Sequence, residues 1–173
     1  MYDIYSCSGD DRLRFLLGRH GRRMLFVVGL NPSTATQEKS DTTVAKVEAV
    51  AHQHGYSGFA MLNLYPARAT NFNTLPLLPD PTAVEKNLAA IAGLLANSRK
   101  PTVWAAWGQS VLARPFFANS ARLLEARLKP LQPNWLHFGA LTARGHPRHP
   151  SRLSYAWSFA AFNLQAYVAS LDA

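Results

Sequence analysis

Amide, hydroxyl and imidazole side chains follow the apolar runs of this sequence at three separate places. Asn31-Pro32-Ser33 follows the run 24–28 and a glycine, Asn63 lies near the end of the run 59–65, and residues 145–152 hold two histidines among prolines. A short apolar run closed by a glycine is typical of a buried strand that ends at a turn. In an open α/β sheet, ligands bind where the carboxyl ends of the strands meet such turns. The pattern therefore predicts a site assembled from distant segments.

Asn31 and Asp41 are the candidates for handling a water molecule. Asn31 has no charge, but its side-chain oxygen can orient a water. In the alternative interpretation this side chain caps the following turn. Asp41, at the start of the next predicted helix, is an acid that could serve as a general base. A helix N-cap is the more usual use of an aspartate just before an amphipathic stretch, and this interpretation is favoured.

Asn63 and the histidine loop suit the recognition of a polar ligand. Asn63 interrupts an apolar run, and a buried amide must find partners, so it either contacts a ligand or ties two loops together. An amide offers the donor and acceptor that a pyrimidine edge requires. His146 and His149 suit leaving-group stabilisation or phosphate contact. Neither cysteines nor an acid cluster accompany them, so no metal and no cofactor are expected.

Arginines and aromatic residues flank the same segments. Arg144, Arg148 and Arg152 surround the histidine loop, and Arg68 follows the Asn63 strand, which together favours a phosphate-binding collar. Tyr65 is expected to stack on a base, unless it packs beneath the loop. The serines lack the nucleophile-elbow pattern of serine hydrolases, and the phosphate-loop and dinucleotide fingerprints are missing from the sequence.

The elements that must position these residues alternate between strand and helix. Apolar patterning predicts strands over 13–17, 24–28, 59–65, 102–108 and 134–141, and helices over 42–54, 82–97, 109–128 and 154–171, the third broken near Pro115. The first two strands are expected to form a hairpin at the sheet edge, with a short helix from Asp10 as the alternative. The loop 67–81 is long enough to be a lid or binding loop. This alternation favours one α/β domain over residues 1–173, with a largely parallel sheet.

Composition and charge narrow the class of protein. The chain has 173 residues, of which 48% are hydrophobic and 16% charged, as in globular domains. Eighteen Lys and Arg against ten Asp and Glu give a net charge of +8, which favours a polyanionic partner such as nucleic acid, although basic charge without a binding role is equally common. One cysteine excludes an internal disulfide. The sequence shows neither the pattern of a secretion signal nor an apolar run long enough to span a membrane, so a cytoplasmic protein without a membrane partner is expected.

The ordered motifs resemble the Domain of Unknown Function 1643 family. The resemblance rests on Asn31-Pro32-Ser33, Asp41-Thr42-Thr43, Asn63-Leu64, Ala69-Thr70, Trp107-Gly108 and the stretch 145–150, and it spans roughly residues 12–153. One departure is the stretch Glu85-Lys86-Asn87, where the family pattern carries an asparagine-aspartate pair.

A more distant resemblance is to the uracil-DNA glycosylase superfamily, whose fold is a three-layer αβα sandwich with a mainly parallel central sheet. It is carried by Gly29 to Pro32, Asn63, Trp107-Gly108 and His149-Pro150-Ser151. The resemblance implies that Asn31 holds water, Asn63 reads a base, His149 contacts the base carbonyl and Ser151 lies by a phosphate. The catalytic candidates are then Asn31, Asp41 and His149, the base-binding candidates Asn63 and Tyr65, and the phosphate-binding candidates Ser33, Ser151, Arg148 and Arg152.

Three functions are compatible with these residues. The leading hypothesis is hydrolysis of, or another attack on, an N-glycosidic bond in a nucleic acid, with DNA preferred, or in a nucleotide, after a base enters the pocket. The alternative is a non-catalytic module of the same fold that binds a nucleic acid or nucleotide. A third is a small-molecule hydrolase or transferase that uses Asp41 and His149.

Overall fold

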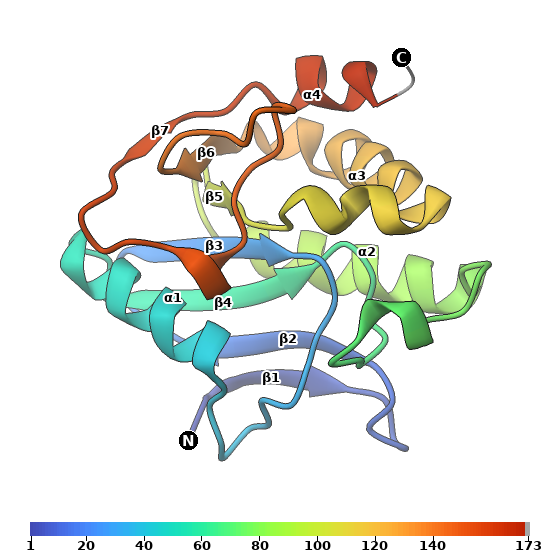
Figure 1. Ribbon diagram of the computed structural model, residues 1–173. Coiled ribbons are helices and arrows are strands. Elements are labelled where there is room, and N and C mark those ends of the chain that lie inside the picture. The colour runs from blue at the N-terminus through green and yellow to red at the C-terminus, as the bar shows by residue number, and fades with distance from the viewer. Residues whose placement is uncertain (172–173) are drawn as a thin grey trace.

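The computed structural model describes residues 1–171 as a mixed seven-stranded sheet with helices on both faces (Figure 1). The strands are β1 (Ile4–Cys7), β2 (Arg14–Arg19), β3 (Met24–Gly29), β4 (Gly58–Asn63), β5 (Thr102–Ala105), β6 (Asn134–Phe138) and β7 (Phe159–Ala161). Their order across the sheet is β1-β2-β4-β3-β5-β6-β7. The four central strands run parallel, and β1, β2 and β7 pair antiparallel at the two sides. The α/β class is confirmed, and the sheet is mixed.

In residues 1–171, three α-helices connect strands of this sheet, and a fourth follows the last strand. They are α1 (Thr42–Gln53), α2 (Pro81–Leu95), α3 (Pro115–Leu128) and α4 (Leu164–Ser170). Four short 3-10 turns accompany them: η1 (Phe72–Thr74), η2 (Gln109–Ala113), η3 (Lys129–Leu131) and η4 (Pro150–Arg152). The break expected near Pro115 is confirmed, because η2 ends just before it and Pro115 begins α3. The stretch 67–81 is mostly irregular, as expected, apart from a single bridge between Ala67 and Leu13, η1 and the first residue of α2.

The core has two parts, one on each face of the sheet. Successive residues of a strand point to opposite faces, so Leu25 and Val27 of β3 pack toward α1, whereas Phe26 and Val28 pack toward α2, α3 and α4. All four side chains are at most 1% exposed. A strand buried on both faces has no polar alternation, which explains the unbroken apolar run in the sequence. This central strand fixes the position of the Asn31-Pro32-Ser33 turn that follows it.

The hairpin expected between the first two predicted strands is wrong. β2 pairs antiparallel with β1 on one side and β4 on the other, while β3 is enclosed by β4 and β5. Gly18 allows the close approach of β2 to β4, since a Cβ there would lie 2.0 Å from the carbonyl oxygen of Phe59. Strand β1, which the sequence patterning did not predict, supplies the edge. The chain therefore crosses over β4 to enter β3, and β2 becomes an inner strand.

The long final helix expected over 154–171 is also wrong. Residues 159–161 form β7, which pairs with β6, and α4 begins only at Leu164 after the N-cap Asn163. Phe159 makes edge and tilted ring contacts with Trp104 and Phe138, which hold the extended strand against the core. Of the expected helix, only residues 164–170 are helical.

Candidate functional site

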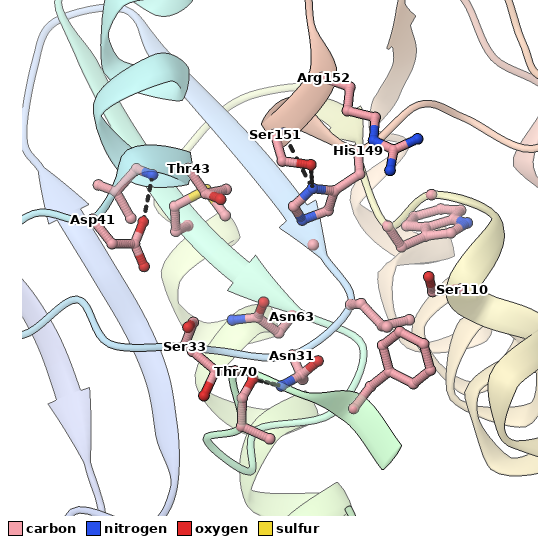
Figure 2. Close-up of a pocket in the computed structure, with 18 of the residues that line it drawn as sticks. Asn31, Ser33, Asp41, Thr43, Asn63, Thr70, Ser110, His149, Ser151 and Arg152 are labelled. Carbon is pink, nitrogen blue, oxygen red and sulfur yellow. Dashed lines mark hydrogen bonds between the residues drawn. The ribbon is translucent and has the colours of Figure 1, made fainter. Parts of the chain in front are cut away.

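A cavity of about 560 Å³ opens at the carboxyl ends of β3, β4 and β5 (Figure 2). Its lining comes from the turn after β3, the end of β4, the Trp107-Gly108 turn and the 142–152 loop. The lining residues are Arg14, Gly29, Leu30, Asn31, Ser33, Asp41, Thr43, Val44, Met61, Asn63, Ala69, Thr70, Phe72, Trp107, Gly108, Gln109, Ser110, Thr142, Arg148, His149, Ser151 and Arg152. Eight of the nine site residues predicted from the sequence line this one cavity, and Tyr65 does not.

Asn31 combines the two roles considered for it. Its Nδ2 donates to the carbonyl oxygens of Ala69 at 2.9 Å, Pro32 at 3.0 Å and Ala67 at 3.4 Å, so it fastens the start of the 67–81 loop to the turn. Within residues 1–171, its Oδ1 receives no hydrogen bond. With the amide nitrogen held in place, this oxygen is an oriented acceptor for a water or a ligand N–H.

Asn63 is the buried polar group of the site. It ends β4, is 2% exposed, and its Nδ2 has no hydrogen-bond partner in residues 1–171. Its backbone carbonyl accepts a hydrogen bond of 2.8 Å from Nδ2 of Asn87 on α2. A Cβ on Gly29 would lie 3.0 Å from Asn63 Oδ1, so glycine leaves room for this side chain. An unpaired buried donor is costly, and an acceptor brought by a ligand would remove that cost.

His149 presents an N–H toward the cavity. It is the N-cap of η4, and its Nδ1 accepts from the Ser151 amide at 3.1 Å and lies 2.9 Å from Ser151 Oγ. With Nδ1 as acceptor, the neutral ring carries its proton on Nε2. Burial lowers the pKa of His149 below 6.5; Asp41 acts in the opposite direction and Lys46 in the same direction. The neutral tautomer with a donating Nε2 is thus the favoured form.

Gly108 allows the histidine loop to approach the end of β5. Its φ is +72°, a conformation that glycine adopts without strain. A Cβ at this position would lie 3.1 Å from Cβ of His149. The absence of a side chain at Gly108 therefore sets how deeply His149 enters the cavity.

Asp41 is the N-cap of α1, as favoured from the sequence. Its Oδ1 accepts from the Val44 amide at 2.9 Å, and its Oδ2 accepts from the Ala35 amide at 3.3 Å. Asp41 also lines the cavity, but both carboxylate oxygens already hold backbone donors. Its structural role is therefore established, and a further role as a general base stays a prediction.

The residues expected to bind phosphate lie around the opening, with differing freedom. Arg148 donates from Nε to the Ala140 carbonyl at 2.7 Å and lies over the Trp157 ring, 5.4 Å from its centroid. Arg152 is exposed, and within residues 1–171 its side chain has neither a hydrogen bond nor an ion pair. Ser33 and Ser151 present their hydroxyls in the same lining.

Three residues that the sequence placed at the site do not line the cavity. Tyr65, expected to contact a base, is 2% exposed; its ring packs on Phe116 and its hydroxyl accepts from the Asp80 amide at 3.1 Å. Arg68 turns toward β1 and binds the carbonyl oxygens of Ser33 and Ala35. The alternative weighed for Tyr65, packing beneath the loop, is the observed one. Arg144 is exposed and lies outside the cavity lining.

His146 belongs to a buried network behind the cavity. Its Nδ1 lies 3.0 Å from the Tyr167 hydroxyl, which also accepts from Trp107 Nε1 at 3.0 Å. Burial and the charge of Arg144 lower the pKa of His146, and burial raises the pKa of Tyr167 to about 12. The network connects α4 to the Trp107-Gly108 turn and the histidine loop. Within residues 1–171, no three His, Cys, Asp or Glu side chains are grouped as metal ligands would be.

Arg14 is a charged lining residue that was not predicted from the sequence. The alternation of Leu13, Phe15 and Leu17 predicts that Arg14 points outward, yet it is 2% exposed. The register explains the difference: Ser6 pairs with Leu16 and Cys7 pairs with Arg14, so Phe15 is an extra residue. A bulge of this kind interrupts the alternation of faces. Nothing in the sequence of β2 alone signals it.

Comparison with known proteins identifies a family but no function. The model of a family described as Protein of unknown function (DUF1643) matches residues 14–151. Neither the curated proteins nor the solved structures contain a match. Within residues 1–171, the helices are too short or too polar to cross a membrane. Since the match covers most of the chain, this protein belongs to the DUF1643 family.

Proposed function

We propose that this protein is a nucleobase-recognising hydrolase with a fold like that of uracil-DNA glycosylases, acting on the N-glycosidic bond of a nucleic acid or nucleotide. One observation carries the proposal. The Nδ2 donor of Asn63, the Nε2 donor of His149 and the Oδ1 acceptor of Asn31 belong to residues that line a single cavity, and protein groups hold the Asn31 and His149 side chains in orientation.

The arrangement suits the edge of a base that carries carbonyl groups. Asn63 Nδ2 and His149 Nε2–H are donors for carbonyl oxygens, and Asn31 Oδ1 accepts from a ligand N–H or from a water. A cavity of about 560 Å³ lies within the usual range for small-molecule sites, roughly 300–1,000 Å³. The base leaves the stack of its strand to enter such a site.

The reaction is a displacement at the glycosidic carbon. The bond between this carbon and the base nitrogen breaks, and its electron pair leaves with the base. Donation from His149 Nε2–H and Asn63 Nδ2–H stabilises the negative charge that develops on the base carbonyl. The water oriented by Asn31 Oδ1 adds to the carbon and gives up a proton to the departing base. The products are the free base and a sugar hydroxyl, so atoms and electrons balance.

The charge of the lining supports a phosphate-bearing substrate. Three arginines and one aspartate line the cavity, so the pocket is net positive with its histidine neutral. Arg148, Arg152, Ser33 and Ser151 are the groups that we assign to phosphates next to the bound base. Cations near a phosphate backbone give an affinity that falls steeply with salt.

A second candidate is a binding module of the same fold without catalysis. The specific observation in its favour is that both oxygens of Asp41 accept backbone N–H bonds. The acid that lines the cavity is thus occupied as a helix cap. A module of this kind holds the base through the same Asn31, Asn63 and His149 contacts and releases nothing.

Excision assays separate the two candidates. Oligonucleotides that contain uracil, hypoxanthine or a mismatch, and the corresponding free nucleotides, are incubated with the protein, and the free base is quantified. The hydrolase releases base, and Asn31→Ala and His149→Gln reduce the rate at least tenfold, whereas Asn97→Ala, an exposed residue at the other end of the sheet, retains it. Salt-sensitive binding without release supports the module. If the protein shows neither base release nor salt-sensitive binding, both candidates are overturned.

A further inference from the structure

Arg14 is a buried cation at the edge of the cavity with few hydrogen bonds. It is 2% exposed, and its one hydrogen bond within residues 1–171 runs from Nη1 to the Ala35 carbonyl, 2.9 Å away. Its Nε is buried without a partner, and its Nη2 makes no hydrogen bond to any described residue. Burial, together with the neighbouring charge of Arg68, lowers the pKa of Arg14 to about 10. A buried charge without a partner is costly unless something else pairs with it.

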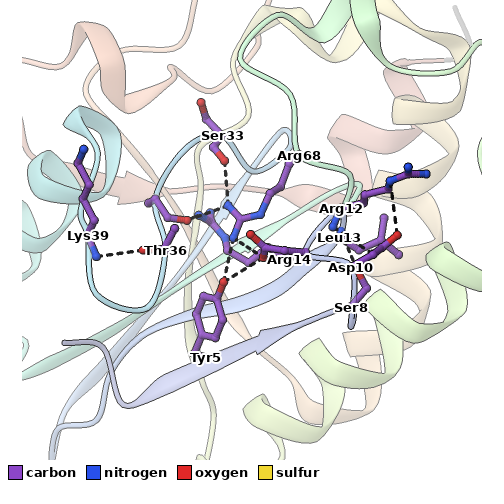
Figure 3. A network of polar contacts seen from close by, with 12 residues as sticks. Tyr5, Ser8, Asp10, Arg12, Leu13, Arg14, Ser33, Thr36, Lys39 and Arg68 are labelled. Atoms are coloured by element: carbon purple, nitrogen blue, oxygen red, sulfur yellow. Dashed lines mark hydrogen bonds and ion pairs between the residues drawn. The ribbon is translucent and has the colours of Figure 1, made fainter.

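The neighbouring Arg68 makes more contacts than Arg14 in the same place, although its Nε is likewise buried without a partner (Figure 3). It donates to the carbonyl oxygens of Ser33 and Ala35 at 2.9 and 2.8 Å, and it pairs with the Asp11 carboxylate at 3.0 Å. Arg14 shares the Ala35 carbonyl with Arg68 but contacts no carboxylate among residues 1–171. Asp41 is near enough to raise the pKa of Arg14, yet its oxygens hold the Val44 and Ala35 amides.

The cavity around Arg14 offers donors for an anion. Among the described residues that line the cavity, two buried polar atoms lack a hydrogen-bond partner, Nε of Arg14 and Nδ2 of Asn63. Both atoms are donors. The hydroxyl-bearing residues Ser33 and Thr43 belong to the same lining. A ligand that pairs with these two donors must therefore bring acceptors, and a guanidinium binds an anionic oxygen pair best.

We infer that Arg14 binds a terminal acidic group of the ligand, a phosphate monoester or a carboxylate. An internal phosphodiester continues as a strand on both sides and does not fit against a side chain that is 98% enclosed, whereas a terminal group does. Arg14 thus differs from Arg148 and Arg152 at the opening, which can contact a strand that passes by. The inference rests on the pocket of the proposed function but does not require bond cleavage, and it favours a free nucleotide or an acidic base over a polymer.

Calorimetric titration tests this with matched neutral and anionic probes. Uridine is compared with uridine 5′-monophosphate, and uracil with orotate, which adds a carboxylate to the base. We expect at least one anionic probe to bind tenfold or more tightly than its neutral partner. Arg14→Gln should abolish that ratio, and Arg14→Lys should keep part of it. Arg22→Gln, at the other end of the sheet, should leave it unchanged. The uridine pair tests for a phosphate monoester, and the uracil pair tests for a carboxylate on the base.

A second readout on the unmodified protein covers the case in which Arg14→Gln fails to fold. The Nε–H signal of a buried arginine is observed by ¹⁵N NMR, and the folded Arg14→Lys variant assigns it. Addition of the tighter anionic probe should shift this signal, and addition of its neutral partner should not. Equal affinity for neutral and anionic probes, an anionic preference that survives Arg14→Gln, or an unmoved signal overturns the inference. Anion binding through Arg14 without base release overturns the hydrolase alone.

Discussion

Replacement of Asn63 by leucine should stabilise the protein while abolishing ligand binding. Leucine has nearly the shape of asparagine but no polar atoms. Asn63 Nδ2 is buried without a partner among residues 1–171, and a donor in this state costs about 1–3 kcal/mol. Removing it should raise the free energy of unfolding by about 1–2 kcal/mol. For a chain of this size that corresponds to a rise in Tm of about 2–8 °C.

Asn87→Leu is the matched control for this prediction. Asn87 is equally buried and its Oδ1 also lacks a partner, but its Nδ2 donates to the Asn63 carbonyl at 2.8 Å, so its loss leaves that carbonyl unpaired. This variant should lose up to about 2 kcal/mol, because removal of the unpaired Oδ1 offsets part of the cost. Both variants are followed by calorimetry and urea denaturation, and their affinity for the tightest probe is measured. If Asn63→Leu destabilises the protein as much as Asn87→Leu does, Asn63 is a structural residue and our assignment of it to a ligand is refuted.

Three further predictions concern the groups around the cavity. Burial lowers the pKa of His149 below 6.5, so the stability contributed by its neutral ring is complete above pH 6.5 and is lost as the pH falls from 6.5 toward the folded-state pKa. His149→Gln should therefore reduce the slope of unfolding free energy against pH in that window. An unchanged slope contradicts this prediction. Arg68→Met should lower the free energy of unfolding, measured by urea denaturation, by about 2–3 kcal/mol, because it removes the ion pair with Asp11 and several hydrogen bonds. Arg19→Met, which removes an exposed ion pair, should lower it by less than about 1 kcal/mol. Equal losses would show that Arg68 is not structural. Gly108→Ala should cost about 1–3 kcal/mol, because φ is +72° and the new Cβ would lie 3.1 Å from His149 Cβ, and it should weaken probe binding; calorimetry that shows neither effect contradicts the fit of these two residues.

Much of the fold could be predicted because the central strands are buried on both faces. Their unbroken apolar runs and closing turns mark β3, β4 and β5, and Asp41 marks the start of α1. The edges could not be predicted in the same way. Pairing of β2 with β4 depends on a close contact at Gly18, and β7 depends on ring contacts of Phe159. Such contacts join residues distant in sequence, so local patterns do not report them.

The convergence of the candidate site residues followed from strand order. Parallel strands place their carboxyl ends at one edge, which brings Asn31, Asn63 and His149 to the same cavity. Side-chain direction was harder to predict. Tyr65, two residues after Asn63, turns into the core, and Arg14 turns inward because of a bulge. These directions depend on local register.

The Tyr167 hydroxyl has a consequence for the order in which this protein assembles. It joins Trp107, which lines the cavity, to His146, which lies behind it, and both residues are synthesised earlier. While a nascent chain lacks α4, both side chains remain without this shared partner, although the sheet strands that precede them are already made. The scaffold can therefore form during translation before its loops are latched together. Ligand recognition is therefore expected only after α4 has been made.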